Sequence, residues 1–151
     1  KPAVTAEGRL DMWQIAIKPG KPLAFGAVKK QYPQTAEASE TWFMGLPGNP
    51  VSSFVTFLLF VRPFIAKLQG RKNFATPTMS IRADFDWVKP DRRNEFLRVR
   101  MNDKGGLDLF PNQSSGVLTS ASWADGLVDN PASQVIKKGD FVKYMPFSGM
   151  L

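Results

Sequence analysis

The feature that most limits the fold is an apolar stretch at residues 51–68, directly after the sequence Pro47-Gly48-Asn49-Pro50. Apolar side chains cover most of the helical circumference of this stretch, so a helix here must be buried on more than one side. We therefore expect one long helix that packs against two other elements. Pro63 lies inside the stretch and is expected to kink the helix, because proline has no amide hydrogen to donate.

Short strand-like segments lie on both sides of the predicted helix. The expected strands are residues 12–17, 23–26, 41–46, 79–85, 95–101, 107–110, 117–119 and 140–146. Residues 29–40 are polar and are expected to form a loop. Short alternating strands separated by turns, as found after residue 78, are typical of a small all-β barrel or sandwich. We place the domain boundary where this pattern begins, which predicts one domain over residues 1–72 and a second over residues 73–151.

Composition excludes several kinds of chemistry. The chain of 151 residues has no Cys and no His, which excludes disulfides, thiolate and imidazole catalysis, and histidine or cysteine metal sites. Its net charge of +7, from 20 basic and 13 acidic residues, favours anionic partners, although a merely soluble basic surface gives the same number. The first ten residues show no secretory signal, so we expect a cytoplasmic location. The apolar stretch falls short of the ~20 residues that cross a bilayer, so we expect no membrane partner.

The start of the predicted helix is a candidate anion site. Asn49 suits the N-cap and Pro50 the first helical position. The amides of Val51, Ser52 and Ser53 would then face outward at the positive end of the helix dipole, and Gly48 would let a ligand approach the backbone. A well-capped helix with no ligand explains the same residues.

Basic residues elsewhere suggest further oxyanion contacts. Lys18 and Lys21 lie three positions apart in a turn that Pro19 and Pro22 stiffen, so their ammonium groups can converge on one anion. An ordinary solvated turn between strands is the alternative.

Two segments of the second half are also candidates. On a strand, Phe96, Arg98 and Arg100 would share one face, while Leu97, Val99 and Met101 would face the core. The arginine face is either an anion groove or a solvated outer surface. The loop at residues 112–116 is either a hydrogen-bonding wall for an oxyanion or a simple turn.

Taken together, these motifs resemble one protein family. The series Lys18-Pro19-Gly20-Lys21-Pro22, then Gly45-Leu46-Pro47-Gly48-Asn49-Pro50-Val51-Ser52, then Arg93-x-x-Phe96-x-Arg98 and Gln113-x-Ser115, is similar to the molybdopterin molybdenumtransferases. This is the family of bacterial MoeA and the gephyrin E domain. The resemblance covers nearly the whole chain. It implies the last part of a three-layer α/β molybdopterin-binding domain followed by a small β-barrel domain.

The resemblance also implies a reaction and a set of residues. Family members insert molybdenum from molybdate into adenylylated molybdopterin and release AMP. The residues that match the catalytic positions are Lys18, Lys21, Arg93 and Ser115. Those that match positions for molybdate or molybdopterin-AMP are Lys18, Lys21, Pro22, Pro47, Gly48, Asn49, Ser52, Arg93 and Ser115. Cations with hydroxyl and backbone donors suit a tetrahedral dianion.

Members of the family carry, before the region seen here, a Gly-Gly-rich phosphate loop and an acidic residue for the divalent metal. The resemblance is therefore to a C-terminal fragment, which we expect to be inactive alone, with the Mg²⁺ ligand upstream and no metal site in this chain. It further implies a homodimer at full length and small-molecule substrates. The alternatives are a scaffold of the gephyrin type and a basic nucleic-acid-binding barrel. In the latter, Arg98 and Arg100 beside Phe96 would follow a phosphate backbone.

Overall fold

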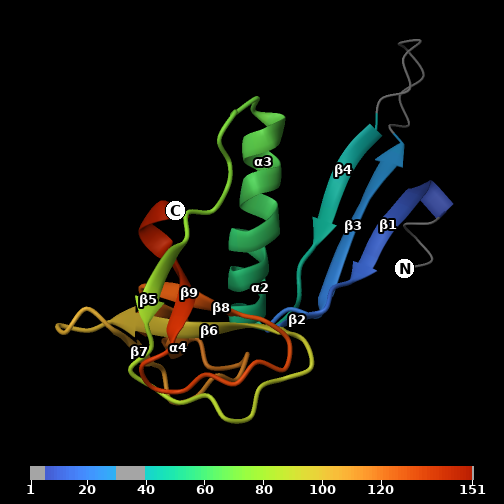
Figure 1. Ribbon diagram of the computed structural model, residues 1–151. Coiled ribbons are helices and arrows are strands. Elements are labelled where there is room, and N and C mark those ends of the chain that lie inside the picture. The colour runs from blue at the N-terminus through green and yellow to red at the C-terminus, as the bar shows by residue number, and fades with distance from the viewer. Residues whose placement is uncertain (1–5, 30–39, 151) are drawn as a thin grey trace.

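A computed structural model describes residues 6–29 and 40–150 of the chain (Figure 1). Three antiparallel strands form a first sheet in the order β1-β3-β4. Their bounds are β1 (Gly8–Gln14), β3 (Pro22–Lys29) and β4 (Glu40–Gly45). The strands expected at residues 23–26 and 41–46 are confirmed, while the strand expected at 12–17 is divided between β1 and the short β2 (Ile17–Lys18). The predicted loop at 29–40 falls almost wholly outside the described residues.

One continuous helix follows β4 and runs from Pro50 to Leu68. It consists of α2 (Pro50–Thr56), a π-helical segment η1 (Phe57–Val61) and α3 (Arg62–Leu68). The predicted irregularity takes the form of the π segment, which lies just before Pro63 and widens the hydrogen-bonding pattern where proline cannot donate.

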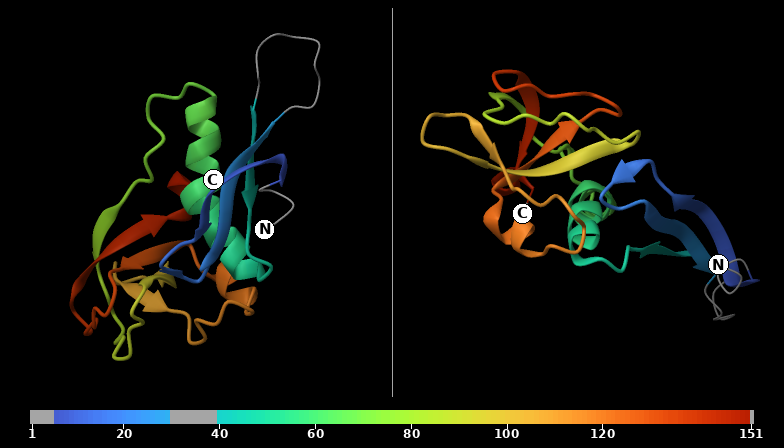
Figure 2. Two further views of the ribbon diagram at one scale, coloured as in Figure 1. Left: turned by 90° about the vertical axis from the view of Figure 1, so that its right-hand side faces the viewer. Right: turned by 90° about the horizontal axis from the view of Figure 1, so that it is seen from below.

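The length of this helix corrects one expectation. With 19 residues it is long and apolar enough to cross a membrane by length and composition, so the prediction that the stretch is too short is wrong. One such helix is weak support for a membrane segment, because a core helix passes the same test. Here Phe64 makes edge contacts with Phe25 and Trp42 of the first sheet, at ring separations of 5.4 and 6.0 Å. The opposite side of the helix packs on the second half of the chain (Figure 2).

The second sheet closes into a small barrel. Its strands run in the order β2-β6-β8-β9-β5, and β7 pairs with the last residues of β6, from Val99 to Met101. Their bounds are β5 (Met79–Arg82), β6 (Asn94–Met101), β7 (Leu107–Leu109), β8 (Gly126–Asn130) and β9 (Phe141–Pro146). A bridge between Ala83, just past β5, and Leu107 of β7 joins the two edges of the sheet. The strands expected near 79, 95, 107 and 140 are therefore present.

Two predictions in this half are wrong. Residues 117–119 are not a strand but lead into helix α4 (Thr119–Trp123), where the Ser120 hydroxyl donates to the Val117 carbonyl at 2.6 Å. Strand β8 was not predicted, because the following Asn130-Pro131 pair reads as a turn. In the structure Asn130 is still part of β8 and pairs with Glu95 of β6. Its side chain donates to the Gln134 carbonyl at 2.9 Å, so the turn begins after Asn130.

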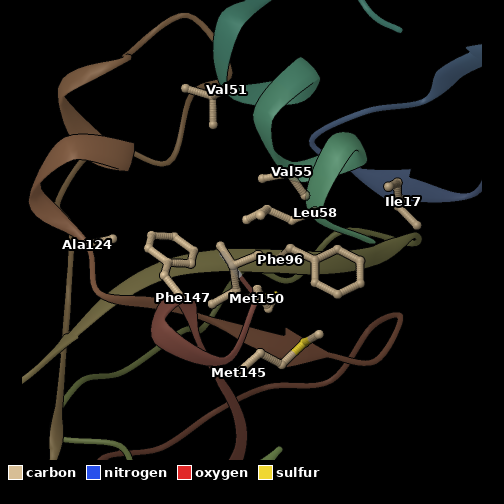
Figure 3. Close-up of a cluster of buried hydrophobic side chains, with 10 residues drawn as sticks. Ile17, Val51, Val55, Leu58, Phe96, Ala124, Met145, Phe147 and Met150 are labelled. Carbon is tan, nitrogen blue, oxygen red and sulfur yellow. The ribbon is translucent and has the colours of Figure 1, made fainter. Parts of the chain in front are cut away.

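The core is continuous between the helix and the barrel. One cluster combines residues of β2 and the helix with residues of the barrel (Figure 3). Its buried members are Ile17, Val51, Val55, Leu58, Phe96, Ala124, Leu127, Met145, Phe147 and Met150. A second cluster, around Leu97, Val99 and Val128, fills the barrel itself. The parallel pairing of β2 with β6 adds a strand from the first part of the chain to the barrel sheet. A domain boundary near residue 72 stays a prediction.

Candidate oxyanion site

A pocket of about 330 Å³ lies where four segments of the chain meet. It is lined by Lys18, Pro19, Gly20, Lys21, Ser52, Arg93, Gln113, Ser114 and Ser115. The structure thus brings together five of the residues that the sequence marks as a site, namely Lys18, Lys21, Ser52, Arg93 and Ser115. They come from the turn after β2, the first turn of α2, the residue before β6, and the loop between β7 and α4.

The lysine turn is fixed at both ends. Before it, Ile17 and Lys18 pair with Asn94 and Glu95 of β6, and after it the Ile15 amide donates to the Lys21 carbonyl at 2.9 Å. Gly20 sits at the tightest point with φ of +117°, and a Cβ there would lie 2.6 Å from the Thr56 methyl group. A side chain at this position would push the turn away from the helix, so glycine is needed to place both lysines in the pocket.

The start of α2 differs from the prediction in its hydrogen bonds. Asn49 occupies the N-cap position with φ −76° and ψ 130°, but its side chain makes no capping bond. Its Nδ2 donates instead to the hydroxyl of Ser115 at 3.2 Å. The Ser53 amide donates to the Asn49 carbonyl at 2.9 Å, so the expectation that this amide is free for an anion is wrong. The Ser53 hydroxyl donates to the Pro47 carbonyl. Ser52 is the residue of this helix turn that lines the pocket.

Four other predicted residues do not line the pocket. Pro22 is exposed at the start of β3 and lies opposite Gln14 of β1. Pro47 is buried, and Gly48 is exposed with open space around the position of a Cβ. Asn49 lies next to the pocket through its hydrogen bond to Ser115.

Carboxylates that the sequence analysis did not single out neutralise two of the pocket cations. The Arg93 guanidinium makes a two-pronged pair with Asp91, with Nε–Oδ1 and Nη2–Oδ2 distances of 2.9 Å. Lys18 Nζ lies 3.4 Å from Asp91 Oδ2 and 3.2 Å from Glu95 Oε1. The hydrogen bonds from Arg93 hold the pKa of Asp91 well below its ordinary value, so this carboxylate is charged at neutral pH. Within the described part of the chain, Lys21 forms no such pair.

Glu95 is fixed more firmly than Asp91. It is 1% exposed, and its Oε2 accepts hydrogen bonds from Trp87 Nε1 at 2.7 Å and from the Asp91 amide at 3.0 Å. A sequence signal for both carboxylates was available. Asp91, Arg93 and Glu95 stand two positions apart in the sequence, and a bend at residues 92 and 93, in which the Arg93 amide donates to Asp91 Oδ1 at 3.0 Å, brings the Asp91 carboxylate beside the Arg93 side chain.

Arg98 corrects the predicted arginine face. It is 1% exposed, and its guanidinium donates to Ser120 Oγ and to the carbonyls of Phe96 and Ser114 at 3.2 to 3.3 Å. Burial lowers the pKa of Arg98 to about 10. Met101, expected in the core, is 40% exposed. A buried Arg98 cannot contact backbone phosphates, so of the two arginines in the nucleic-acid alternative only Arg100 is exposed.

Gln113 explains how the loop is held beside Arg98. Its side chain accepts from the Arg98 amide at 2.9 Å and donates to the carbonyls of Arg98 and Phe110 at 3.0 and 2.8 Å. This side chain replaces a missing strand partner of β6 and carries Ser114 and Ser115 to the pocket.

A second polar pocket, of about 410 Å³, is less suited to an anion. Its lining is Arg82, Asp84, Asn102, Asp103, Lys104, Asp108 and Lys138, in which carboxylates equal cations in number. Arg82 already pairs with Asp84 at 2.8 Å. No group of three or more acidic, His or Cys residues able to hold a metal occurs in the described ranges.

Comparison with known proteins identifies the family. Residues 80–147 match the family model described as MoeA C-terminal region (domain IV). The chain is 42% identical over 105 residues to the molybdopterin molybdenumtransferase of Haemophilus influenzae, covering 68% of this chain and 24% of that protein. It is 37% identical over 130 residues to the molybdenum cofactor synthesis protein cinnamon of Drosophila melanogaster, covering 82% and 20%.

Solved structures agree with the fold. A molybdopterin biosynthesis MoeA protein of Pyrococcus horikoshii superposes with a TM-score of 0.73 at 26% identity, covering 97% of this chain and 34% of that one. A molybdenum cofactor biosynthesis protein of Pyrococcus furiosus gives a TM-score of 0.72 at 24% identity, covering 92% and 46%. The chain belongs to the molybdopterin molybdenumtransferase family, which includes MoeA and gephyrin-type proteins, and spans about a quarter of the length of the first-named relative.

Proposed function

We propose that the full-length protein carrying this chain inserts molybdenum from molybdate into adenylylated molybdopterin and releases AMP. The observation that carries the proposal is the single pocket in which Lys18, Lys21, Ser52, Arg93 and Ser115 meet. Membership of the family supports it, as does the name molybdopterin molybdenumtransferase borne by the Haemophilus influenzae relative.

Molybdate is the substrate that this pocket is proposed to hold. It is a tetrahedral dianion, so it needs several donors around it to replace its hydration. Lys18, Lys21 and Arg93 supply charge, and the hydroxyls of Ser52 and Ser115 supply directed hydrogen bonds. We propose these residues as the molybdate-binding set, with Lys18, Lys21, Arg93 and Ser115 acting on the reacting oxyanion.

The loop beside the pocket, in which Gly48 and Asn49 are exposed, is proposed to hold the nucleotide and pterin part of the second substrate. Pro47, Gly48 and Asn49 form this loop, and Asn49 joins it to Ser115 by a hydrogen bond of 3.2 Å. Pro22, exposed at the start of β3, is proposed to contact the same substrate at a distance from the oxyanion pocket. We also propose that β1, β3, β4 and the long helix are the last part of a three-layer α/β domain, the rest of which lies outside this chain.

Three further properties of the full-length protein are proposals from the family alone. They are a homodimeric state, a cytoplasmic location with neither membrane nor nucleic acid as partner, and a requirement for Mg²⁺. The described residues do not fit a Mg²⁺ site, because they contain no cluster of three acidic ligands and because Asp91 and Glu95 already pair with cations. The Mg²⁺ ligand is therefore proposed outside this chain, and no step at this pocket depends on it.

Molybdate-dependent release of AMP from adenylylated molybdopterin tests the proposed activity. The full-length protein is expected to release AMP only when molybdate is present. AMP release that does not respond to molybdate, or no release at all, contradicts the proposal.

Gly48 allows a prediction about the loop alone. Its Cβ position has no heavy atom within 4 Å, so Gly48→Leu should leave the fold intact while its side chain fills the space proposed for the substrate. We expect Gly48→Leu to weaken binding of adenylylated molybdopterin by about tenfold or more, because a built-in clash discriminates against the ligand. Binding is measured by calorimetry and folding by the melting temperature. Gly48→Ala serves as the small control, and normal binding by Gly48→Leu contradicts the assignment of this loop.

A further inference from the structure

Asp91 lies outside the pocket lining but bridges two of the pocket cations, Lys18 and Arg93. Its Oδ2 lies 2.9 Å from Arg93 Nη2 and 3.4 Å from Lys18 Nζ, and its Oδ1 lies 2.9 Å from Arg93 Nε. A carboxylate presents two oxygens to a guanidinium in the same forked geometry as a tetrahedral oxyanion does. Two of the three pocket cations are therefore already engaged by a side chain of the protein itself.

Asp91 and Glu95, the two carboxylates beside the pocket, differ in how easily they can move away from the pocket cations. The Glu95 side chain is 1% exposed, is held by Trp87 Nε1 and belongs to β6 in register with Lys18. The Asp91 side chain is 23% exposed and precedes β6, whose first residue is Asn94. Rotation of the Asp91 side chain into solvent would break a partly buried pair with Arg93 and the hydrogen bond from the Arg93 amide, whereas moving Glu95 would expose a side chain that is 1% exposed and break its bond from Trp87 Nε1.

Charge balance also favours removal of Asp91 when a dianion binds. Lys18, Lys21 and Arg93 carry three positive charges, and Glu95 and Asp91 carry two negative charges. A dianion added to this set leaves an excess negative charge in the pocket. If Asp91 turns away, the three cations, Glu95 and the dianion are neutral together, which is the arrangement that costs least to desolvate.

We propose that Asp91 is an internal competitor of the oxyanion, which releases Arg93 and Lys18 when the ligand binds, while Glu95 stays in place as the permanent counterion of Lys18. This inference rests on the proposed function, because it takes the pocket as the oxyanion site. On this proposal Asp91 lowers the affinity of the pocket for the oxyanion. A residue that only positions Lys18 and Arg93 would raise that affinity.

The test is calorimetric titration of the full-length protein with sodium molybdate, comparing the wild type with Asp91→Asn. In the wild type the Arg93 amide donates to Asp91 Oδ1 at 3.0 Å. Asparagine keeps an Oδ1 acceptor for this amide and removes the negative charge. We expect Asp91→Asn to bind molybdate more tightly by up to about fivefold, the free-energy scale of an exposed ion pair. Its melting temperature should be unchanged or lower, since folded-state ion pairs are lost.

The matched control is Asp103→Asn, which changes the net charge equally at an exposed residue outside this pocket and should leave molybdate affinity unchanged. A crystal structure with molybdate bound should show the Asp91 carboxylate beyond hydrogen-bond distance of Arg93. Wild-type binding with equal or weaker binding by Asp91→Asn, or an equal gain in Asp103→Asn, overturns the inference and leaves the oxyanion pocket standing. Absence of binding in both the wild type and Asp91→Asn overturns the oxyanion pocket, and this inference with it.

Discussion

Replacement of Lys21 by alanine is expected to lower molybdate-dependent turnover by about 10- to 150-fold. This range corresponds to the roughly 1.5–3 kcal/mol that a hydrogen bond to a charged group contributes. Lys21 lines the pocket and has no carboxylate partner among the described residues, so its charge is fully available to a dianion. Turnover at limiting molybdate is the measurement. Folding should be little affected, because Lys21 is exposed.

Comparison with the paired cations makes this prediction sharper. Lys18→Ala and Arg93→Ala should also lower turnover, but each also removes a partner of Asp91 or Glu95 and so changes the structure around the pocket. Lys72→Ala is the matched control, since it removes the same charge from an exposed residue between α3 and β5. Turnover at the wild-type level in all three pocket variants would contradict the proposal that this pocket binds the oxyanion.

The family resemblance marked the pocket residues, and local sequence added a physical reason for those that lie in short segments next to proline. Lys18 and Lys21 belong to one proline-rich turn, and Ser52 lies at a helix start with clear breaker residues before it. What brings them to Arg93 and Ser115 is tertiary structure, namely the parallel pairing of β2 with β6 and the side-chain clamp of Gln113. Neither contact leaves a local pattern in the chain.

The pairing of the pocket cations was missed for a different physical reason. The basic residues were considered as free charges, whereas in a folded chain a cation pairs with a carboxylate that lies close to it. The close spacing of Asp91, Arg93 and Glu95 carried that information. Arg98 was misplaced because alternation predicts one outward face, but both faces of β6 are covered, one of them by the Gln113 loop and α4.

The helices and strands with a strong hydrophobic pattern could be predicted from the sequence. Those that exist only because they pair with neighbouring strands could not. The long helix and β3, β4, β6 and β9 have dense apolar or aromatic runs, and each lies where the pattern places it. Strand β8 contains Gly126, Asp129 and Asn130, which are poor strand formers, and it exists because it pairs with β6 on one side and β9 on the other. Residues 117–119 begin with the apolar Val117 and Leu118 but pair with no strand in the described structure.

Truncation of Leu58 is expected to have the largest effect on stability, because this side chain belongs to the core that the helix and the barrel share. It is fully buried near the middle of the long helix and belongs to the cluster that joins the helix to β6, β8 and β9 (Figure 3). Leu58→Ala is expected to lower the free energy of unfolding by about 2–5 kcal/mol, the cost of a buried leucine truncation with its cavity. Urea denaturation gives the magnitude, and amide hydrogen exchange shows where the loss falls.

Because the core is shared, exchange should accelerate in β6 and β8 as well as in α2 of Leu58→Ala. The control is Leu68→Ala in the same helix, where the side chain is 61% exposed and truncation should change stability by less than about 0.5 kcal/mol. Acceleration confined to the helix would mean that the barrel folds independently of it. In that case the packing of Ile17, Val55 and Leu58 against Phe96 would contribute little to holding the lysine turn beside Arg93, and the pocket would depend on the β2–β6 pairing alone.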